Sequence, residues 1–450
     1  MILAVSGSLM HFLLPVKRRW KENLFHRMFC SLSRAYIFLV FPNRKLINPY
    51  GEDFRKPAVI ISNHQSLIET PALLRLYPKI IILTTTWVYN SPVFGPVARL
   101  ASFYNVDHGL DSIMDKLRQK VSEGYSILIF PEAHRSKDHS IQRFHRGAFY
   151  LAEQLKLDIL PIMMFGTGDF LEPGEFWGRP NMFRQKIYSR ISIDDHSLGS
   201  TYQERTKAFR QFYKREYEQF ETIEGNTEYY RRLLTLNYIY KGPVLEWYLR
   251  IKLLLEANYS LLNEYVVRNG DILDLGCGFG FISHMLALTS SGRKITGVDF
   301  DEEKIRVAGA GFLCNNRTRF VTADIRNFEF TSFDCIILSD VLHYLPTPDQ
   351  QDLIRKCMLN LRDDGMIIIR DADENRKKGH SRSMLTETLS TGIKFNKTFD
   401  GSGKMHFTSG LNIEKVAAAG GFKLEVIGLK SYSSNTCYLL RKNESEVAAS

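Results

Sequence analysis

Short apolar runs alternate with helix-sized segments in the first half of the chain, from about residue 57 to residue 193. Between these runs, residues 111–124 and 147–156 place their apolar side chains at helical spacing. This alternation is typical of an α/β domain whose strands run mostly parallel. Strands are predicted at residues 58–62, 79–85, 126–130, 158–165 and 186–193.

A second region with the same alternation begins at Asp271 and predicts a Rossmann-like, doubly wound sheet. Between the two regions, residues 201–220 predict a charged amphipathic helix. Residues 226–267 are too apolar for a solvated linker, so we expect a helical connector there. Strands of the second sheet are predicted at residues 271–275, 294–298, 319–322, 335–339, 366–370, 423–428 and 436–441.

Positive charge is concentrated at the start of the chain. The 450 residues carry a formal net charge of +10, and residues 1–50 hold eight Lys and Arg against one Glu. The same residues include two apolar clusters, a combination that predicts a helix in the plane of an anionic membrane. A core helix packed on the next domain is the alternative. The cations follow the first apolar run, the reverse of a signal peptide, which favours retention on the cytoplasmic side.

Composition narrows the class of protein. Hydrophobic residues make up 44% of the chain and charged residues 24%, which excludes a disordered or collagenous protein. The six cysteines form no CxxC pair, so we expect a reducing compartment, no disulfide scaffold and no metal site.

A glycine-rich loop follows the first strand of the second region. Asp274 is followed by Gly276, Gly278 and Gly280, whose small size lets backbone amides approach a ligand. The next predicted strand ends at Asp299, 19 residues after Gly280, where a ribose-binding carboxylate belongs in a nucleotide-binding βαβ unit. The glycines of the loop fall short of the full G-x-G-x-x-G spacing of a dinucleotide-binding fingerprint. This difference favours a compact adenosine ligand over one with a pyrophosphate.

From Asp271 to its end, the chain resembles the class I S-adenosylmethionine-dependent methyltransferases. DLGCGFG resembles their first motif and FDCIILSDVLHYL their fourth-strand motif. The resemblance implies S-adenosylmethionine as cofactor. It also implies that Asp299 binds the ribose hydroxyls, that Asp324 and Ile325 lie at the adenine, and that Ser339 and Asp340 lie near the transfer site.

Asp340 and His343 are the candidates for chemistry in this half. Methyl transfer from a sulfonium mainly requires alignment of the acceptor, so the protein needs little further catalysis. His343 is able to act as a general base for an acceptor hydroxyl, because an imidazole titrates near neutral pH. The alternative is a helix histidine that is satisfied by its neighbours.

His64 and Glu69 form the candidate catalytic pair of the first half. They lie five residues apart, roughly 140° around a helix, so they meet only if His64 lies in the turn that precedes the helix. A carboxylate that holds one imidazole nitrogen leaves the other to take a proton from a hydroxyl. The alternative for Glu69 is an acid on a helix surface.

Two later segments, FPEAHRS (130–136) and RFHRG (143–147), add a carboxylate and several cations suited to a phosphate. With NHQSLIE, they resemble the glycerophospholipid acyltransferase family over about residues 55–195. The resemblance implies that His64 is the general base and Glu69 its orienting acid. The acceptor head group would be held by Glu132, Arg135, Arg143, Arg146 and Gly147. This sequence departs from the family pattern at two places. Glu69 stands where the family has Asp, and Ala133-His134 replaces Gly-Thr.

The resemblances together predict a bifunctional enzyme on the cytoplasmic face of a bacterial inner membrane. It would acylate a lysophospholipid-like acceptor from acyl-CoA or acyl carrier protein and methylate a lipid, as in larger proteins that also carry a lipid transporter. A methyltransferase with an inactive, lipid-binding acyltransferase-like half is the rival. We expect no nucleic-acid partner, because a membrane explains both the charge and the apolar clusters. The expected divisions are a membrane-contact segment (1–50), an acyltransferase domain (51–222), a connector (223–270), a methyltransferase domain (271–442) and a frayed tail (443–450).

Overall fold

The structure is a computed structural model that divides the chain into two compact units, Met1–Glu224 and Gly225–Ser450. The helices of the expected connector belong to the second unit. The described residues are 18–92, 95–107, 109–136, 139–171, 178–179, 181–255, 258–372, 406–427 and 435–443.

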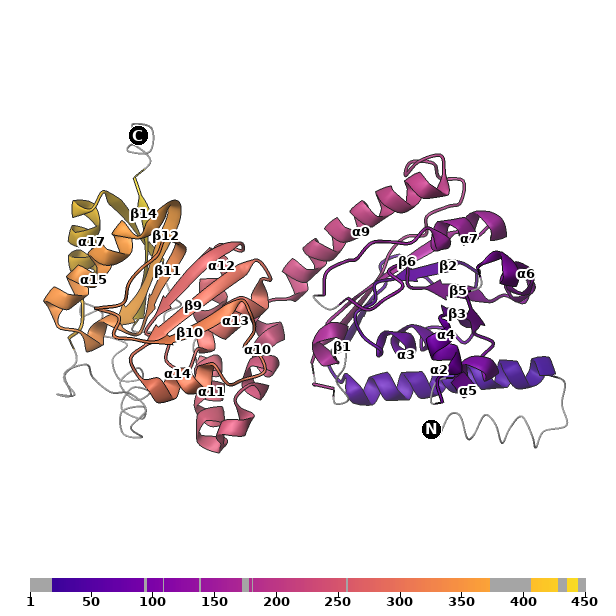
Figure 1. The fold of residues 1–450 in the computed structure, drawn as a ribbon, viewed down its shortest axis with the longest axis horizontal. Helices are drawn as coiled ribbons and strands as arrows, with labels where there is room; N and C mark the ends of the chain where they lie inside the picture. Colours follow the sequence, from indigo (N-terminus) through magenta and orange to yellow (C-terminus); the bar gives the residue numbers. More distant parts are fainter. Residues whose placement is uncertain are drawn as a thin grey trace. The chain divides into compact units, whose positions relative to one another are not determined.

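A seven-stranded sheet forms the centre of the first unit, in the order β1-β7-β6-β2-β5-β3-β4 (Figure 1). Neighbouring strands are parallel except β6 and β7, which are antiparallel. The strands are β1 (Arg44–Ile47), β2 (Val59–Ser62), β3 (Ile80–Thr84), β4 (Tyr104–Asn105), β5 (Ser126–Ile129), β6 (Ile159–Phe165) and β7 (Phe183–Ile187).

Helices cover this sheet, with α2 and α9 on opposite sides of it in Figure 1. The α9 helix packs on β6 and α7, and α2 packs on α3. No helix in the described part of the chain is long and apolar enough to cross a bilayer. The helices are α2 (Arg18–Val40), α3 (Glu69–Leu74), α4 (Thr86–Asn90), α5 (Gly95–Leu100), η1 (Asp111–Ile113), α6 (Met114–Ser122), α7 (Gly147–Leu155), α8 (Thr167–Phe170) and α9 (Tyr202–Glu224).

The apolar runs predicted as strands form β2, β3, β5 and β6, the inner strands of the sheet. β2, β3 and β6 are buried at every position, as expected for parallel strands covered on both faces. The strand predicted at 186–193 is misplaced, because β7 ends at Ile187. Beyond it, the amide of Tyr188 donates to the backbone oxygen of Pro161, and Ile191 forms an isolated bridge to Ile159. The alternating pattern of KIYSRISI therefore belongs mostly to irregular chain.

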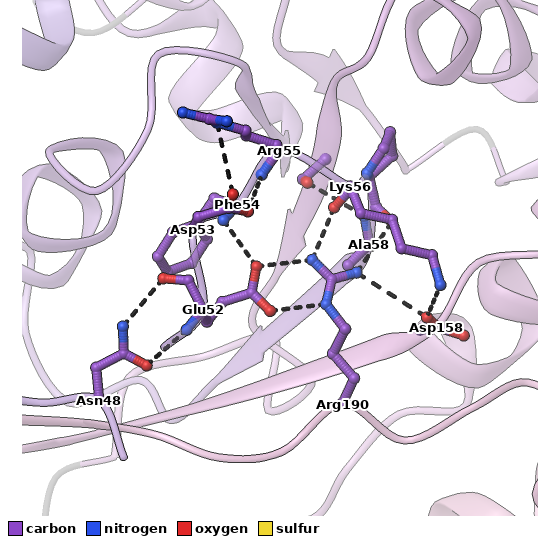
Figure 2. A network of polar contacts seen from close by, with 11 residues as sticks. Asn48, Glu52, Asp53, Phe54, Arg55, Lys56, Ala58, Asp158 and Arg190 are labelled. Atoms are coloured by element: carbon purple, nitrogen blue, oxygen red, sulfur yellow. Dashed lines mark hydrogen bonds and ion pairs between the residues drawn. The ribbon is translucent and has the colours of Figure 1, made fainter. Parts of the chain in front are cut away.

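Arg190 ties the segment before β2 to the segment after β7 (Figure 2). Its guanidinium donates to both carboxylate oxygens of Glu52, at 2.7 and 2.8 Å, and to the backbone oxygen of Lys56 at 2.8 Å. Lys56 in turn pairs with Asp158 at 2.6 Å. The hydrogen bonds from Arg190 hold the pKa of Glu52 below its ordinary value.

We expect Arg190→Ala to destabilise the first unit by about 2 kcal/mol at neutral pH, because Glu52 then loses a bidentate, charge-assisted partner. Since the pKa of Glu52 is lowered in the folded state, the stabilisation is complete above its unfolded pKa and is lost as the pH falls through the folded pKa. Urea unfolding at neutral and acid pH measures both effects, and the difference between variant and wild type should shrink in acid.

Arg55→Ala is the matched control for this prediction. Arg55 belongs to the same network, but its pair with Asp53 is exposed, with side-chain exposures of 82% and 61% (Figure 2). Exposed pairs contribute about 0.5 kcal/mol or less. Equal effects of the two substitutions would contradict the importance we assign to Arg190.

The second unit is built on a seven-stranded sheet in the order β10-β9-β8-β11-β12-β14-β13. β14 is antiparallel to both neighbours, β12 and β13, and lies between them, unlike the sixth strand of a dinucleotide-binding sheet. The strands are β8 (Gly270–Leu275), β9 (Arg293–Asp299), β10 (Thr318–Thr322), β11 (Phe333–Ser339), β12 (Leu361–Ala372), β13 (Phe422–Ile427) and β14 (Asn435–Lys442).

Two apolar clusters, one on each face, confirm the predicted doubly wound sheet. Ile367 and Ile369 of β12 belong to a cluster with α15 and α17, whereas Ile368 belongs to a cluster with α12 and α13. The helices are α10 (Thr227–Leu236), η2 (Ile239–Lys241), α11 (Pro243–Leu255), α12 (Asn258–Tyr265), α13 (Phe281–Thr289), α14 (Glu302–Ala308), η3 (Leu342–Tyr344), α15 (Thr347–Leu359) and α17 (Gly410–Ala419).

Candidate active sites

His64 lies in the loop after β2, and Glu69 is the first residue of α3. The structure brings them together, with 2.7 Å between His64 Nδ1 and a Glu69 carboxylate oxygen. The imidazole stacks on Phe130 at 4.1 Å between ring centroids, and 17% of its side chain is exposed. The imidazole of His64 is thus partly accessible, and a carboxylate holds one of its two ring nitrogens.

The Glu69 side chain is completely buried, which excludes a surface helix acid. Its carboxylate accepts hydrogen bonds from the backbone amide of Gln65, at 2.9 and 3.0 Å, and from the hydroxyl of Thr167 at 2.7 Å. These contacts fix the longer side chain that replaces the family's aspartate.

Two tyrosines of α9 support the loop that carries His64. Tyr213 donates to the backbone oxygen of Ile162 at 2.8 Å, and its hydroxyl accepts from the amide of Asn63 at 3.1 Å. Gln65 donates to the hydroxyl of Tyr217 at 2.7 Å. Sequence reasoning missed these residues, because they lie about 150 positions away and within a helix that appeared only amphipathic.

Glu132 holds the FPEAHRS loop against His64. One carboxylate oxygen accepts from the backbone amide of His64 at 2.9 Å, and the other accepts from the amide of Gln142 at 2.8 Å. The amide of Ser136 donates to the backbone oxygen of His64 at 2.8 Å. Burial raises the pKa of Glu132 to about 7, although the two amides act to lower it. Both oxygens are thus engaged within the chain, an arrangement suited to positioning His64.

Ala133 has a φ of 59°, in the left-handed region that favours glycine. It stands where the acyltransferase family has glycine. We expect Ala133→Gly to stabilise the first unit by up to about 1 kcal/mol, because a side chain in this region costs roughly that much. Thermal unfolding of both proteins measures the effect. Gly109→Ala, a substitution at φ 89° with no atom near the added carbon, should change stability in the opposite direction.

The three predicted head-group arginines lie along the segments that follow β5. Arg143 and Arg146 are exposed and Arg135 is half-buried. None of the three forms an ion pair with a carboxylate in the part of the chain that the structure describes. Gly147 begins α7, and a side chain there would approach Leu110 to 3.2 Å. The arginines are therefore available to an anionic ligand.

In the second unit, backbone amides of the glycine loop turn toward the end of β9. The amide of Gly276 donates to the backbone oxygen of Val298 at 2.8 Å, and the amide of Gly278 donates to the Asp299 carboxylate at 2.8 Å. The other Asp299 oxygen accepts from the amide of Asp301 at 2.9 Å. Since each carboxylate oxygen has two lone pairs, both retain acceptor capacity for ligand hydroxyls.

Gly278 and Gly280 have φ values of 53° and 75°. A side-chain carbon at Gly280 would collide with Phe320, whereas one at Gly278 would meet no atom closer than 4.0 Å. Asp274 is buried beneath the loop and accepts from the hydroxyl of Ser283 at 2.5 Å. Burial raises the pKa of Asp274 to about 6. The buried Asp274 therefore supports the loop from the interior of the unit, and the space beside Gly278 is open.

The two residues predicted at the adenine differ in their surroundings. Asp324 pairs with Arg326, at 2.6 Å for the shortest contact, and this hydrogen bond lowers its pKa. The side chain of Ile325 is fully buried in the core cluster with α15 and α17, which leaves only its backbone for a ligand.

Ser339 is the last residue of β11, and Asp340 follows it at the same edge of the sheet. The Ser339 hydroxyl is buried with no hydrogen-bond partner in the described part of the chain. Asp340 has a φ of 55° and pairs with Arg370, and Asn435 donates to it at 2.7 Å. Burial raises the pKa of Asp340, but the charges of Arg370 and Lys252 outweigh it, so the net pKa is lowered.

His343 forms a second buried histidine–carboxylate pair. Its Nδ1 lies 2.6 Å from a carboxylate oxygen of Asp371, and the side chains are 1% and 0% exposed. The other Asp371 oxygen accepts from the amide of Leu342 at 2.8 Å. Asp371 was missed in the sequence, because it is 28 residues away at the end of β12.

A separate cavity of about 450 Å³ lies at the amino ends of β8, β9 and β10. Lys294, Arg319 and Arg362 are among its lining residues. None of the predicted site residues lines it, since they gather at the carboxyl ends of the strands.

Comparisons with known proteins identify one domain in each half of the chain. The acyltransferase family matches residues 43–165, and the methyltransferase domain family matches residues 272–365. A chloroplastic 1-acyl-sn-glycerol-3-phosphate acyltransferase of Brassica napus is 28% identical over 182 residues, which cover 38% of this chain and 51% of the relative. The chain thus spans about half the length of this curated relative.

Two solved structures show a low similarity to this chain. The 1-acyl-sn-glycerophosphate acyltransferase PlsC of Thermotoga maritima is 19% identical, with a TM-score of 0.39, over 48% of this chain and 88% of that one. The calicheamicin-biosynthesis methyltransferase CalO1, in its SAH-bound form, is 17% identical, with a TM-score of 0.35, over 46% of this chain and 61% of that one.

Proposed function

Since the chain joins an acyltransferase domain to a methyltransferase domain, we propose that it is a bifunctional lipid-modifying enzyme. The first unit transfers an acyl group to a lysophospholipid-like acceptor, and the second methylates a lipid or lipid-linked acceptor. The observation that carries the proposal is the contact of 2.7 Å between His64 and the buried Glu69 within the acyltransferase match.

His64 acts as the general base in acyl transfer. Glu69 fixes the tautomer that carries the proton on Nδ1, so Nε2 accepts the proton of the acceptor hydroxyl. The hydroxyl oxygen forms a bond to the thioester carbonyl carbon, the carbon–sulfur bond breaks, and the proton passes from His64 to the departing thiolate. Acyl-CoA or acyl carrier protein supplies the thioester. The completeness of this pair supports an active enzyme over an inactive lipid-binding platform.

Arg135, Arg143 and Arg146 bind the phosphate of the acceptor. Their lack of carboxylate partners in the described part of the chain supports this role. Guanidinium groups match phosphate oxygens in geometry as well as in charge. Glu132 positions the loop against His64 through both of its carboxylate oxygens.

The glycine-loop residues fit S-adenosylmethionine, which supplies an activated methyl group when bound. The open space at Gly278 accommodates a ligand near the loop, and Asp299 retains acceptor capacity for ribose hydroxyls. The unpartnered hydroxyl of Ser339 offers a further polar contact at the ends of the same strands. Asp340 lies at this edge, where it orients the acceptor, and the buried His343–Asp371 pair supports the segment that follows it.

Helix α2 attaches the first unit to the cytoplasmic face of a membrane. One face of α2 packs in the core through Phe25, Cys30 and Ile37. The rest carries exposed apolar side chains together with basic ones, as helices at an anionic interface do. The exposed apolar residues are Trp20, Leu24, Leu32, Tyr36, Phe38 and Leu39.

Mass spectrometry of lipid extracts tests the proposed function. Cells that express the wild type are compared with cells that express His64→Ala or Gly278→Arg. We expect the first variant to lose an acylated lipid and the second to lose a methylated one. Unchanged lipids with His64→Ala, together with a change in the second variant, would assign a binding role to the first unit. Unchanged lipids in both variants would contradict the whole proposal.

A further inference from the structure

Helix α11 and the short η2 helix before it expose a group of apolar side chains. We call this group the α11 face. Leu254 is 78% exposed and Trp247 65%, which is unusual for side chains of this size. The α11 face consists of Ile239, Tyr240, Val244, Trp247, Ile251 and Leu254.

The α11 helix is apolar on two opposite sides. Leu245, Leu249 and Leu253 are buried and attach it to the second unit. Val244, Trp247, Ile251 and Leu254 follow the spacing of a single helical stripe on the other side. The buried leucines alone suffice to pack the helix, so the fold of the unit does not explain the outer stripe.

The segment that carries the α11 face has an excess of positive charge. Residues 227–255 contain five Lys and Arg and two Glu, a net charge of +3. Both glutamates pair with arginines, Glu228 with Arg231 and Glu246 with Arg250. The excess positive charge therefore complements an anionic surface.

The inner side of the same segment contacts the cofactor loop. The rings of Tyr248 and Phe281 lie 6.1 Å apart, and the Tyr238 hydroxyl donates to the backbone oxygen of Phe279 at 2.6 Å. The charge of Lys252 also acts on Asp340. The segment that carries the α11 face thus also contacts the glycine loop of the second unit.

We propose that the α11 face docks on an anionic lipid bilayer and thereby presents the methyl-transfer site to a membrane-embedded acceptor. This inference rests on the proposed lipid acceptor. Tryptophan and aliphatic side chains enter the interfacial region, and the neighbouring cations remain at the anionic head groups. A second copy of the chain is the less suitable occupant, because two faces with the same excess positive charge would repel each other.

Fluorescence of Trp247 in the full chain tests this docking. Trp20, Trp87 and Trp177 are replaced by Phe, so that Trp247 is the remaining indole. The protein is mixed with vesicles that contain phosphatidylglycerol and brominated phosphatidylcholine. We expect strong quenching of Trp247, and weaker quenching when the vesicles lack phosphatidylglycerol. Because quenching reports on this side chain, attachment through α2 does not mask the result.

Substitutions on the α11 face provide a second readout. We expect Ile251→Glu with Leu254→Glu to weaken the quenching and to lower partition to the vesicles by about tenfold or more, since two apolar side chains leave the bilayer. Leu359→Glu is the matched control, because Leu359 is 85% exposed elsewhere on the same unit. It should leave both readouts unchanged.

Unquenched Trp247 would overturn the inference, whether or not the protein floats with the vesicles. A dimer that the double substitution dissociates, together with unquenched Trp247, would assign the face to a second copy. Quenching of Trp247 without any methylated lipid in the cell extracts would contradict the proposed acceptor and leave the docking established. Methylated lipid without quenching would contradict the docking alone.

Discussion

Replacement of His64 by Ala should reduce acyl transfer by about 10³-fold, because general-base catalysis typically contributes factors of this order. The imidazole is the one group in the described part of the loop that is both held by a buried carboxylate and partly exposed. Initial rates with labelled acyl-CoA and 1-acylglycerol 3-phosphate measure the effect. The loss should appear in kcat more than in KM, since His64 acts on the proton that leaves during the reaction.

Two controls separate a catalytic loss from misfolding. Methyl transfer by the same His64→Ala protein should be unchanged, because the second unit has its own sheet and its own site. His196→Ala removes an exposed histidine from the same unit and should retain full acyl transfer. A His64→Ala enzyme within tenfold of the wild-type rate would exclude the general-base role.

The sequence predicted the His64–Glu69 pair because its signal is local. A buried strand, a turn and a helix start follow one another within about a dozen residues, and this order allows one arrangement in which the side chains meet. The parts of the site that were missed are non-local. Thr167 and Tyr217 reach the loop from distant segments, and no local pattern distinguishes them from ordinary core residues.

The same reasoning explains which strands were predicted. β2, β3 and β6 are buried on both faces and appear as apolar runs. β1 is short and partly exposed, with the sequence RKLI, so neither hydrophobicity nor alternation indicates a strand. β7 alternates buried and half-exposed residues. A similar alternation continues past its end, and the strand was therefore predicted too far along the chain, at residues 186–193.

In the methyltransferase half, too, the local features were predicted and the non-local contacts were missed. The glycine loop and Asp299 were predicted by their spacing, and the structure joins them through the hydrogen bond from the Gly278 amide. Asp371 was not predicted, because a carboxylate at the end of β12 meets His343 only when β11 and β12 pair in parallel. Sheet topology supplies this contact.

We expect Gly278→Arg to abolish cofactor binding while the second unit remains folded. A side chain at φ 53° costs about 1–2 kcal/mol, and the space around the added carbon is open, so no core contact is displaced. The arginine would occupy the space beside Asp299 that the adenosine requires. Affinity for S-adenosylhomocysteine, measured by calorimetry, should fall by at least about 100-fold, which corresponds to a loss of roughly 3 kcal/mol.

Gly51→Arg is the matched control. Gly51 has a φ of 65° and no atom within 4 Å of an added carbon, but it lies in the first unit. It carries a similar backbone cost and should leave S-adenosylhomocysteine affinity unchanged. If Gly278→Arg bound the ligand as tightly as the wild type, the cofactor would not lie at this loop, and the roles given to Gly278 and Asp299 would both be wrong. Because acyl transfer depends on the other unit, Gly278→Arg should retain it in full, as His64→Ala should retain methyl transfer.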